Sequence, residues 1–197
     1  MVHGTQNDPR RARREAKISA ILTEAWQLAE RDGLAVISLR ELAARVNLRQ
    51  PSLYVYFASK LDLYDAMFAD GYRQLIDYLN SQPMPTEPRA ALEQFVVENV
   101  RFSSKNPIVH QMLFQRTIPG FAPSPASWEV ALEFYGRASE VLACVGADDQ
   151  ADIDIFSSLI AGLCDQQIAN DPGGDRWVQH VPRVVAMFLT GAVHPAP

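Results

Sequence analysis

The chain has 197 residues, of which 48% are hydrophobic and 21% charged, and its mean hydropathy is -0.09. This composition is typical of a globular protein and excludes the fibrous and intrinsically disordered classes. Because no apolar run reaches the roughly 18 residues of a membrane span, and residues 1–14 are polar with no stretch resembling a signal peptide, we expect a cytoplasmic protein without membrane contact.

The formal net charge of -5 is unevenly distributed along the chain. Residues 1–60 contain 10 Lys and Arg against 6 Asp and Glu, whereas the remaining residues contain 8 against 17. This division indicates a small basic module that meets a polyanion and a larger acidic body that stays away from it.

Residues 10–32 have the apolar periodicity of a helix. Apolar side chains recur at steps of three and four residues between Ile18 and Ala29, and charged residues occupy the other faces. The pair Asp32-Gly33 ends this predicted helix. Its first part, the basic run from Arg10 to Lys17, is either a solvated helix end or an arm that touches phosphates or the minor groove.

Two short helices are predicted next. Ser38 followed by Glu41 has the spacing of a capping box, which predicts a helix from Leu39 to about Val46. Its inward positions would be Leu39, Leu42, Ala43 and Val46. Asn47 ends this helix, and Pro51 is suited to the first turn of another helix about two turns long.

Two short helices joined by such a turn form a helix-turn-helix, whose second helix lies in the major groove of DNA. The spacing of Leu53 and Phe57 predicts that both pack against the two preceding helices. The opposite face then carries Arg49, Gln50, Ser52 and Tyr54. Glutamine can pair with adenine and arginine with guanine, while hydroxyl groups usually contact phosphate.

The next helix begins with a second capping pattern, in which Ser59 is followed by Asp62. Lys60 would then lie at the positive end of the helix and could hold a phosphate group. Taken alone, Arg49 or Lys60 is more often a solvated surface charge, and Tyr54 or Tyr56 can be a packing aromatic. Their combination favours DNA binding.

The stretch ISLRELAARVNLRQPSLYVYFASKLDLYDAM resembles the DNA-binding domain of the tetracycline-repressor (TetR) family of bacterial regulators, with a likeness that covers residues 14–68. The family pattern is matched at Ser38, Leu39, Leu42, Ala43, Leu53, Tyr54, Phe57, Lys60 and Leu63. Two positions depart from it: Tyr56 replaces a frequent His, and Asn47 lies where the turn usually has Gly, although Asn tolerates the left-handed conformation. The predicted DNA-binding residues are Ser38, Arg40, Arg49, Gln50, Ser52, Tyr54, Tyr56 and Lys60.

After residue 58 the pattern stays helical. Helices are predicted over residues 59–80, 90–104, 107–116, 128–145 and 149–169, followed by a last helix to about residue 190, with a loop over residues 118–127. No segment alternates like a strand, so we expect an all-α fold. Pro182 either lies near the start of the last helix, after a separate turn over residues 177–181, or kinks it.

The resemblance implies two domains, a DNA-binding domain over residues 1–58 and an effector-binding and dimerisation domain over residues 59–197. It also implies a homodimer, in which the last two long helices of each subunit form a four-helix bundle. The apolar stripes that fit this role are Ile153, Phe156, Ser157, Ile160, Ala161, Cys164 and Ile168, and Val181, Val184, Val185, Phe188 and Leu189. A monomer core explains them almost as well, but half-site recognition favours a dimer.

Large apolar side chains are concentrated in the middle helices, where a cavity for an apolar or aromatic effector could form. The effector-binding residues that we predict are Phe102, His110, Phe114, Trp128 and Tyr135, with Met112, Leu113, Phe121 and Phe134 nearby. The alternative for each aromatic is an ordinary core position, and His110 can equally be a satisfied core or surface histidine.

No motif for catalysis, a cofactor or a metal ion is found. His3, His110, His180 and His194 have no metal-binding spacing, and Gly173-Gly174 lacks the lysine of a phosphate loop. Asp148, Asp149, Asp152 and Asp154 lack the Gly and Glu of a calcium loop and favour a helix N-terminus instead. We interpret Cys144 and Cys164 as buried apolar thiols.

The sequence therefore predicts a DNA-binding transcriptional regulator, expected to be a repressor that binds a palindromic operator as a dimer and is released by a small-molecule effector. The alternative from another class is a helical small-molecule-binding protein or enzyme without specific DNA binding. A third possibility is an activator or architectural DNA binder that has no effector.

Overall fold

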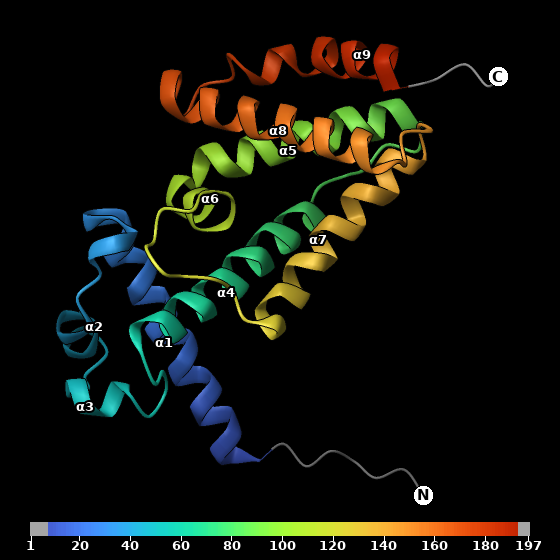
Figure 1. Cartoon of the computed structure of the whole chain (residues 1–197). Helices are drawn as coiled ribbons and strands as arrows, with labels where there is room; N and C mark the ends of the chain where they lie inside the picture. The colour runs from blue at the N-terminus through green and yellow to red at the C-terminus, as the bar shows by residue number, and fades with distance from the viewer. Residues whose placement is uncertain (1–7, 193–197) are drawn as a thin grey trace, which may run out of the picture.

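The computed structural model describes residues 8–192, and these residues form helices joined by loops, which confirms the all-α prediction (Figure 1). The elements are α1 (Pro9–Asp32), the 3-10 helix η1 (Leu34–Val36), α2 (Leu39–Arg45), α3 (Gln50–Leu53), α4 (Lys60–Ser81), α5 (Pro88–Lys105), α6 (Pro107–Phe114), α7 (Pro125–Ala143), α8 (Gln150–Asn170), the 3-10 helix η2 (Val178–His180) and α9 (Val181–Ala192). Helices α2 and α3 lie at one end of the molecule, and α8 and α9 at the other. Over the described range, no helix is long and apolar enough to cross a membrane.

Three of the helices begin at the side chains that the sequence predicts. The Oγ atom of Ser38 accepts a hydrogen bond from Glu41 N at 3.3 Å, and that of Ser59 accepts one from Asp62 N at 3.1 Å. At the start of α8, Asp149 accepts from Asp152 N at 2.7 Å, so the acidic run caps a helix. Within residues 8–192, no group of three metal-ligating side chains is found, and His3 and His194 lie outside the described residues.

Helix α7 begins at Pro125 rather than at the predicted Trp128. Ser124 is the cap, because its Oγ atom accepts from Ser127 N at 3.2 Å, and Pro125 occupies the first turn, where it needs no hydrogen-bond donor. Pro182 is likewise the second residue of α9, after the separate turn of η2, which is the first of the two predicted alternatives.

Helix α3 is shorter than predicted, since only Gln50–Leu53 is α-helical. The chain then tightens into turns in which Tyr56 N and Phe57 N both donate to Leu53 O, at 2.9 and 3.1 Å. Leu53 and Phe57 are buried as predicted, with exposed fractions of 1% and 7%. They belong to a core that also contains Ile21, Leu22, Ala25, Leu28, Ala29, Leu42, Ala43 and Val46.

Helix α4 connects the N-terminal module to the body and is buried on both sides. Its most extensive packing is with α7, and it also contacts α1, α5 and α6. The closest approach is at Gly71, where a Cβ atom would lie 3.0 Å from Leu113 Cδ2 and 3.2 Å from Val109 Cγ1. A glycine is therefore what allows α6 to lie directly on α4.

The two cysteines differ in their surroundings. Cys164 is buried in α8, and burial raises the pKa of its thiol to about 12. Cys144 is exposed, so the prediction that both thiols are buried is wrong for this residue. Cys144 is the C-terminal cap of α7, and the neighbouring Leu142 takes the inward position there.

We expect Gly71→Leu to lower the free energy of unfolding by about 1–3 kcal/mol, because the added side chain overpacks the contact with α6. The matched control is Gly136→Leu in α7, where a Cβ atom has nothing within 4 Å. The free energy of unfolding of this control should rise by about 0.5–1 kcal/mol, because leucine is a better helix former than glycine. Urea unfolding measures both, and equal effects of the two substitutions would contradict the close packing of α6 on α4.

Candidate functional site

The polar face predicted on α3 is open to solvent. Arg49, Gln50 and Tyr54 are exposed, the last with 45% of its surface accessible, and Ser52 and Tyr56 are half-buried. Burial of Leu53 on the other side fixes which face points outward. The structure therefore brings a cation, an amide and a phenol together on one exposed surface, a combination that can contact bases and phosphates.

The turn before α3 depends on Asn47, which has a φ of 55° and is the one residue other than glycine with positive φ in the described range. Leu48 N donates to Ala43 O at 2.8 Å and Asn47 N donates to Ala44 O at 3.1 Å, so the turn satisfies the last carbonyls of α2. Asparagine thus takes the left-handed conformation that the sequence suggested for this position.

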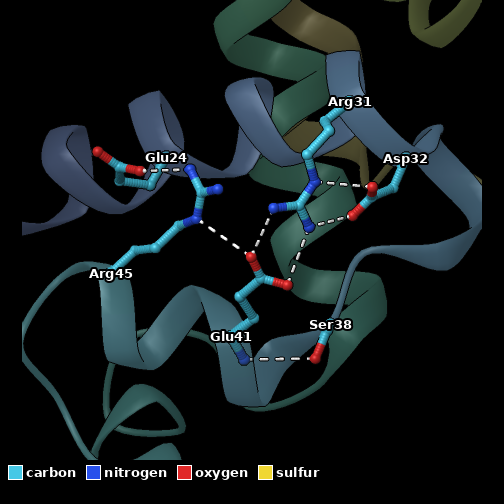
Figure 2. Close-up of polar contacts among 6 residues, drawn as sticks. All are labelled: Glu24, Arg31, Asp32, Ser38, Glu41 and Arg45. Carbon is cyan, nitrogen blue, oxygen red and sulfur yellow. Dashed lines mark hydrogen bonds and ion pairs between the residues drawn. The ribbon is translucent and has the colours of Figure 1, made fainter.

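An ion-pair network holds α2 against α1 (Figure 2). The Arg31 guanidinium donates to both carboxylate oxygens of Glu41, at 2.8 and 3.0 Å, and also pairs with Asp32. Arg45 lies between Glu41 and Glu24, at 3.4 and 3.2 Å. The hydrogen bonds from Arg31 lower the pKa of Glu41. The carboxylate of Glu41 is therefore directed to α1, and only the Ser38 half of the predicted capping box is present.

Two basic residues of α1 support the helix-turn-helix in a way that the sequence analysis missed. Lys17 donates to Val46 O at 2.6 Å, at the C-terminal end of α2, and Arg14 donates to Val55 O at 3.5 Å. The Arg14 guanidinium also lies 5.8 Å from the centre of the Tyr56 ring. Cations at the carbonyl end of a helix are favourable, and this is the signal that could have indicated these contacts.

The remaining predicted DNA-binding residues lie at two helix starts. Ser38 and Arg40 are exposed at the start of α2. Lys60 is half-buried at the start of α4, donates to Ala35 O at 3.0 Å and lies 5.5 Å from the centre of the Tyr64 ring. Burial lowers the pKa of Lys60. Lys60 thus holds η1 against α4, and one of its three donors is already used.

Helix α4 is tied to the elements on both of its sides by polar contacts. On the side of the basic module, Tyr64 donates to Leu34 O at 2.5 Å and the Trp26 indole donates to Asp70 at 2.8 Å. On the side of the body, the Asp65 carboxylate accepts from Ser124 N and Ser127 Oγ, at 2.6 and 2.8 Å. These contacts give α4 a fixed position between the two parts.

The body contains a cavity of about 110 Å³ between α5, α6, α7 and α8, which we call the inner cavity. His110, Phe114 and Tyr135 of the predicted effector set line it. The apolar stripe predicted on α8 also faces this cavity, through Ile153, Phe156, Ser157, Ile160, Ala161 and Cys164. That stripe is therefore turned toward its own chain.

A second cavity of about 270 Å³ lies under the loop after α6, and we call it the outer cavity. Trp128 lines it and stacks on Phe68 with ring centres 6.1 Å apart. Phe114 and Tyr135 line both cavities and form the wall between them. Phe102 lines neither cavity, since it packs against Tyr78 with ring centres 5.4 Å apart.

His110 is 3% exposed and both of its ring nitrogens have partners. Nδ1 lies 3.1 Å from Ser103 Oγ, and Nε2 lies 3.1 Å from Asp165 Oδ1. A carboxylate only accepts hydrogen bonds, so Nε2 carries the proton and Nδ1 accepts from Ser103. Burial lowers the pKa of His110, which favours this neutral form. His110 is therefore a buried histidine whose hydrogen bonds are satisfied within the chain, which is the alternative that the sequence analysis gave to a ligand contact.

An apolar groove of about 330 Å³ lies on the other side of α8, between α8 and α9. Ile155 and Met187 are its most exposed apolar members, with exposed fractions of 54% and 67%, and Leu159, Val184 and Phe188 lie beside them. Val181 and Val185, which belong to the stripe predicted on the last helix, are instead buried within the chain.

Residues 21–67 match the family model described as "Bacterial regulatory proteins, tetR family". A search of curated protein sequences finds no significant match. Among solved structures, the fatty acid degradation regulator FadR from Bacillus halodurans has a TM-score of 0.69 at 17% identity, over 91% of this chain and 97% of that chain. A TetR family regulator from Marinobacter aquaeolei VT8 has a TM-score of 0.66 at 19% identity, over 94% and 100%.

A third similar structure is the transcriptional regulator FadR from Bacillus subtilis in complex with stearoyl-CoA, with a TM-score of 0.65 at 12% identity, over 89% of this chain and 99% of that chain. These structural likenesses show that the fold extends over nearly the whole chain, beyond residues 21–67. The matched family is one of regulators and not of enzymes. The family match thus supports DNA binding by residues 21–67, and the solved structures show the fold of the whole chain.

We expect Asn47→Ala to lower the free energy of unfolding by about 1–2 kcal/mol, because alanine has no means of relieving the left-handed conformation of this turn. Asn47→Gly is the matched comparison and should stay within about 0.5 kcal/mol of the parent, since glycine adopts positive φ without strain. Thermal and urea unfolding of both variants measure the difference. Equal stability of the two would show that the turn is not constrained at residue 47.

Proposed function

We propose that the chain is a homodimeric repressor that binds a palindromic operator and releases it when a small molecule binds, because residues 21–67 match the tetR family of bacterial regulatory proteins. Its DNA-binding domain is residues 1–58, and its effector-binding and dimerisation domain is residues 59–197. The protein works in the cytoplasm, where the operator DNA is found. The observation that carries the proposal is the exposed polar face of α3, held outward by a turn and an ion-pair network.

In this proposal α3 reads base edges and its neighbours hold the backbone. Arg49 and Gln50 contact bases, and Ser52, Tyr54 and Tyr56 contact phosphates. Ser38, Arg40 and Lys60 approach the phosphate backbone from the starts of α2 and α4. Tyr56 is half-buried beside Arg14 and so less accessible than Tyr54, and Lys60 already uses one of its donors on Ala35 O.

Dimerisation through α8 and α9 is supported by the apolar groove between them. The stripe on α8 that faces the inner cavity is used within the chain, so the partner contacts the opposite side, through Ile155, Leu159 and Met187. Ser158 and Gly162 are exposed on the same helix, and small residues allow two helices to approach closely. A two-fold contact there would place one α3 in each half-site.

The effector binds in the inner or the outer cavity. The residues that line these cavities include His110, Phe114, Trp128 and Tyr135. The Bacillus subtilis structure with stearoyl-CoA supports a ligand in a body of this fold. Ligand binding favours a position of α4 in which the two α3 helices no longer match successive major grooves. By linkage, effector and operator lower each other's affinity by the same factor. Unequal factors at equilibrium would contradict the mechanism.

The first experiment identifies the operator by selection from a random duplex library at about 150 mM salt, where binding to phosphates alone is weak. We expect an enriched palindrome. If a folded, ligand-free sample enriches no sequence, the proposal of a sequence-specific repressor is wrong. An enriched site without two-fold symmetry would contradict the dimer.

On the selected operator, we expect Arg49→Ala with Tyr54→Phe to weaken binding by about 10- to 100-fold, because one base contact and one phosphate contact are lost. The dimer should be unaffected, since both side chains are exposed and far from α8 and α9. Arg89→Ala is the control, as it removes an exposed arginine of α5 that pairs with Glu93. Fluorescence anisotropy measures affinity and light scattering measures mass. Unchanged affinity of the double variant would exclude α3 as the reading element.

For the dimer we expect Ile155→Asp with Met187→Asp to yield a folded monomer, because both side chains are exposed within the single chain and charges there oppose an apolar contact. Operator affinity should fall by about 10-fold or more, since each half-site is then bound alone. The control is Leu132→Asp, an exposed apolar position on α7 with an exposed fraction of 44%. Light scattering gives the mass, and a double variant that remains dimeric would place the interface elsewhere.

A further inference from the structure

The chemistry of the inner cavity narrows the class of effector. Its lining contains five aromatic rings, Phe95, Phe114, Phe134, Tyr135 and Phe156, contributed by α5, α6, α7 and α8. Several of these rings contact one another, for example Phe95 and Phe134 with centres 6.0 Å apart. Such a lining suits a flat apolar group that packs against ring faces and edges.

No residue of this lining, in the part of the chain that the structure describes, is Asp, Glu, Lys or Arg. His110 is held neutral between Ser103 and Asp165, and Asp165 itself lies outside the lining with its side chain 53% exposed. A charged ligand in this cavity would therefore be desolvated without a counter-charge, which is strongly unfavourable.

Asn99 is a buried polar side chain of the lining with a free acceptor; Ser157, which also lines the cavity, makes no side-chain hydrogen bond within the described residues but is exposed. Asn99 is 3% exposed and donates from Nδ2 to Phe95 O at 2.7 Å. Among the described residues, no donor reaches its Oδ1 atom. Ser139, also in the lining, donates to Tyr135 O at 3.0 Å and so is already satisfied. A single hydroxyl or N–H group on the ligand would give Asn99 Oδ1 the hydrogen bond it lacks.

The volume limits the size of the ligand. An apolar cavity of about 150 Å³ suffices for benzene, so the inner cavity at about 110 Å³ accepts one ring after slight expansion. A long acyl chain would have to pass the wall formed by Phe114 and Tyr135 into the outer cavity. The outer cavity differs in chemistry, since Arg116 is the charged residue of its described lining.

We infer that the effector of this protein is an uncharged, single-ring aromatic or alicyclic compound with one hydrogen-bond donor, bound in the inner cavity against Asn99. This inference rests on the proposed function, because it assigns the effector to a cavity of the same body. An effector of this class differs in size and charge from a long anionic acyl compound such as stearoyl-CoA.

The test compares benzyl alcohol with benzoate, which share a ring but differ in charge, and includes stearoyl-CoA as a long anionic compound. Isoleucine methyl NMR of the full chain locates each probe, because Ile153 and Ile160 line the inner cavity and Ile118 lines the outer one. We expect benzyl alcohol to shift the signals of Ile153 and Ile160, with a dissociation constant about 10-fold or more below that of benzoate.

Two variants fill the cavity from opposite walls. Ala138→Leu projects into it from α7, and Ala161→Leu projects into it from α8. Each should weaken benzyl alcohol binding by about 10-fold or more, because the added side chain occupies the space of the ring. Ala126→Leu, at an exposed position of α7 outside both linings, should leave the dissociation constant within about two-fold. If Ala138→Leu fails to fold, Ala161→Leu decides, since Ala161 is exposed and tolerates a larger side chain more readily than a buried position.

Tighter binding of benzoate or stearoyl-CoA, or shifts confined to Ile118, would overturn the inference and place the ligand beside Arg116. Absence of benzyl alcohol binding to the folded protein would also overturn it. Operator affinity is measured with the same probes. If benzyl alcohol binds at Ile160 without changing operator affinity, the ligand class stands and the release mechanism fails. If a charged probe alone releases the operator, the mechanism stands and the ligand class is wrong.

Discussion

Helix α4 packs against both the basic module and the body within one continuous core, and the arrangement of the two parts depends on this shared burial. The hydroxyl of Tyr64 and the carboxylate of Asp70 attach it to η1 and α1, while Asp65 attaches it to the start of α7. At Gly71, which has no side chain, Leu113 and Val109 of α6 pack directly on the backbone of α4. A shift of α6 or α7 would cost packing or hydrogen bonds at these contacts unless α4 moved with it, which is how the proposed effector mechanism would reach the basic module.

The basic module uses much of its charge to hold itself together. Arg31 and Arg45 pair with acids, and Lys17 and Lys60 bond to backbone carbonyls. Among residues 8–60, the arginines without an ion pair are Arg10, Arg13, Arg14, Arg40 and Arg49, and Arg14 bonds to Val55 O. The number of basic residues in the sequence therefore overstates the number that are free to contact DNA. The others are used in contacts between residues far apart in the chain.

Local signals in the sequence predicted the all-helical fold and the exposed face of α3. Capping serines and the spacing of Leu53 and Phe57 act over a few residues, so Ser38, Ser59 and the outward position of Gln50 could be predicted. A basic residue near the carbonyl end of a helix is favourable, but the sequence does not identify Val55 and Val46 as the partners of Arg14 and Lys17, because they lie 41 and 29 residues away. The same limit applies to Cys144, whose exposure depends on how α7 lies against its neighbours, and to Phe102, which packs on Tyr78 rather than beside a cavity.

One side of α8 lines the inner cavity and the other lines the groove with α9. The apolar periodicity of the sequence could not show which residues belong to which side. Phe156 and Cys164 face the inner cavity, whereas Ile155 and Leu159 face the groove with α9. Residues that line the cavity and residues that line the groove alternate along α8. A compound that expanded the inner cavity would therefore push against α8, the helix that also carries the proposed dimer contact. In such an arrangement the effector can act on the spacing of the α3 helices by two routes, through α6 and α4 within a subunit and through α8 between subunits. The close packing of Leu113 and Val109 on Gly71 favours the first route in this proposal, because a movement of α6 would disturb its contact with α4.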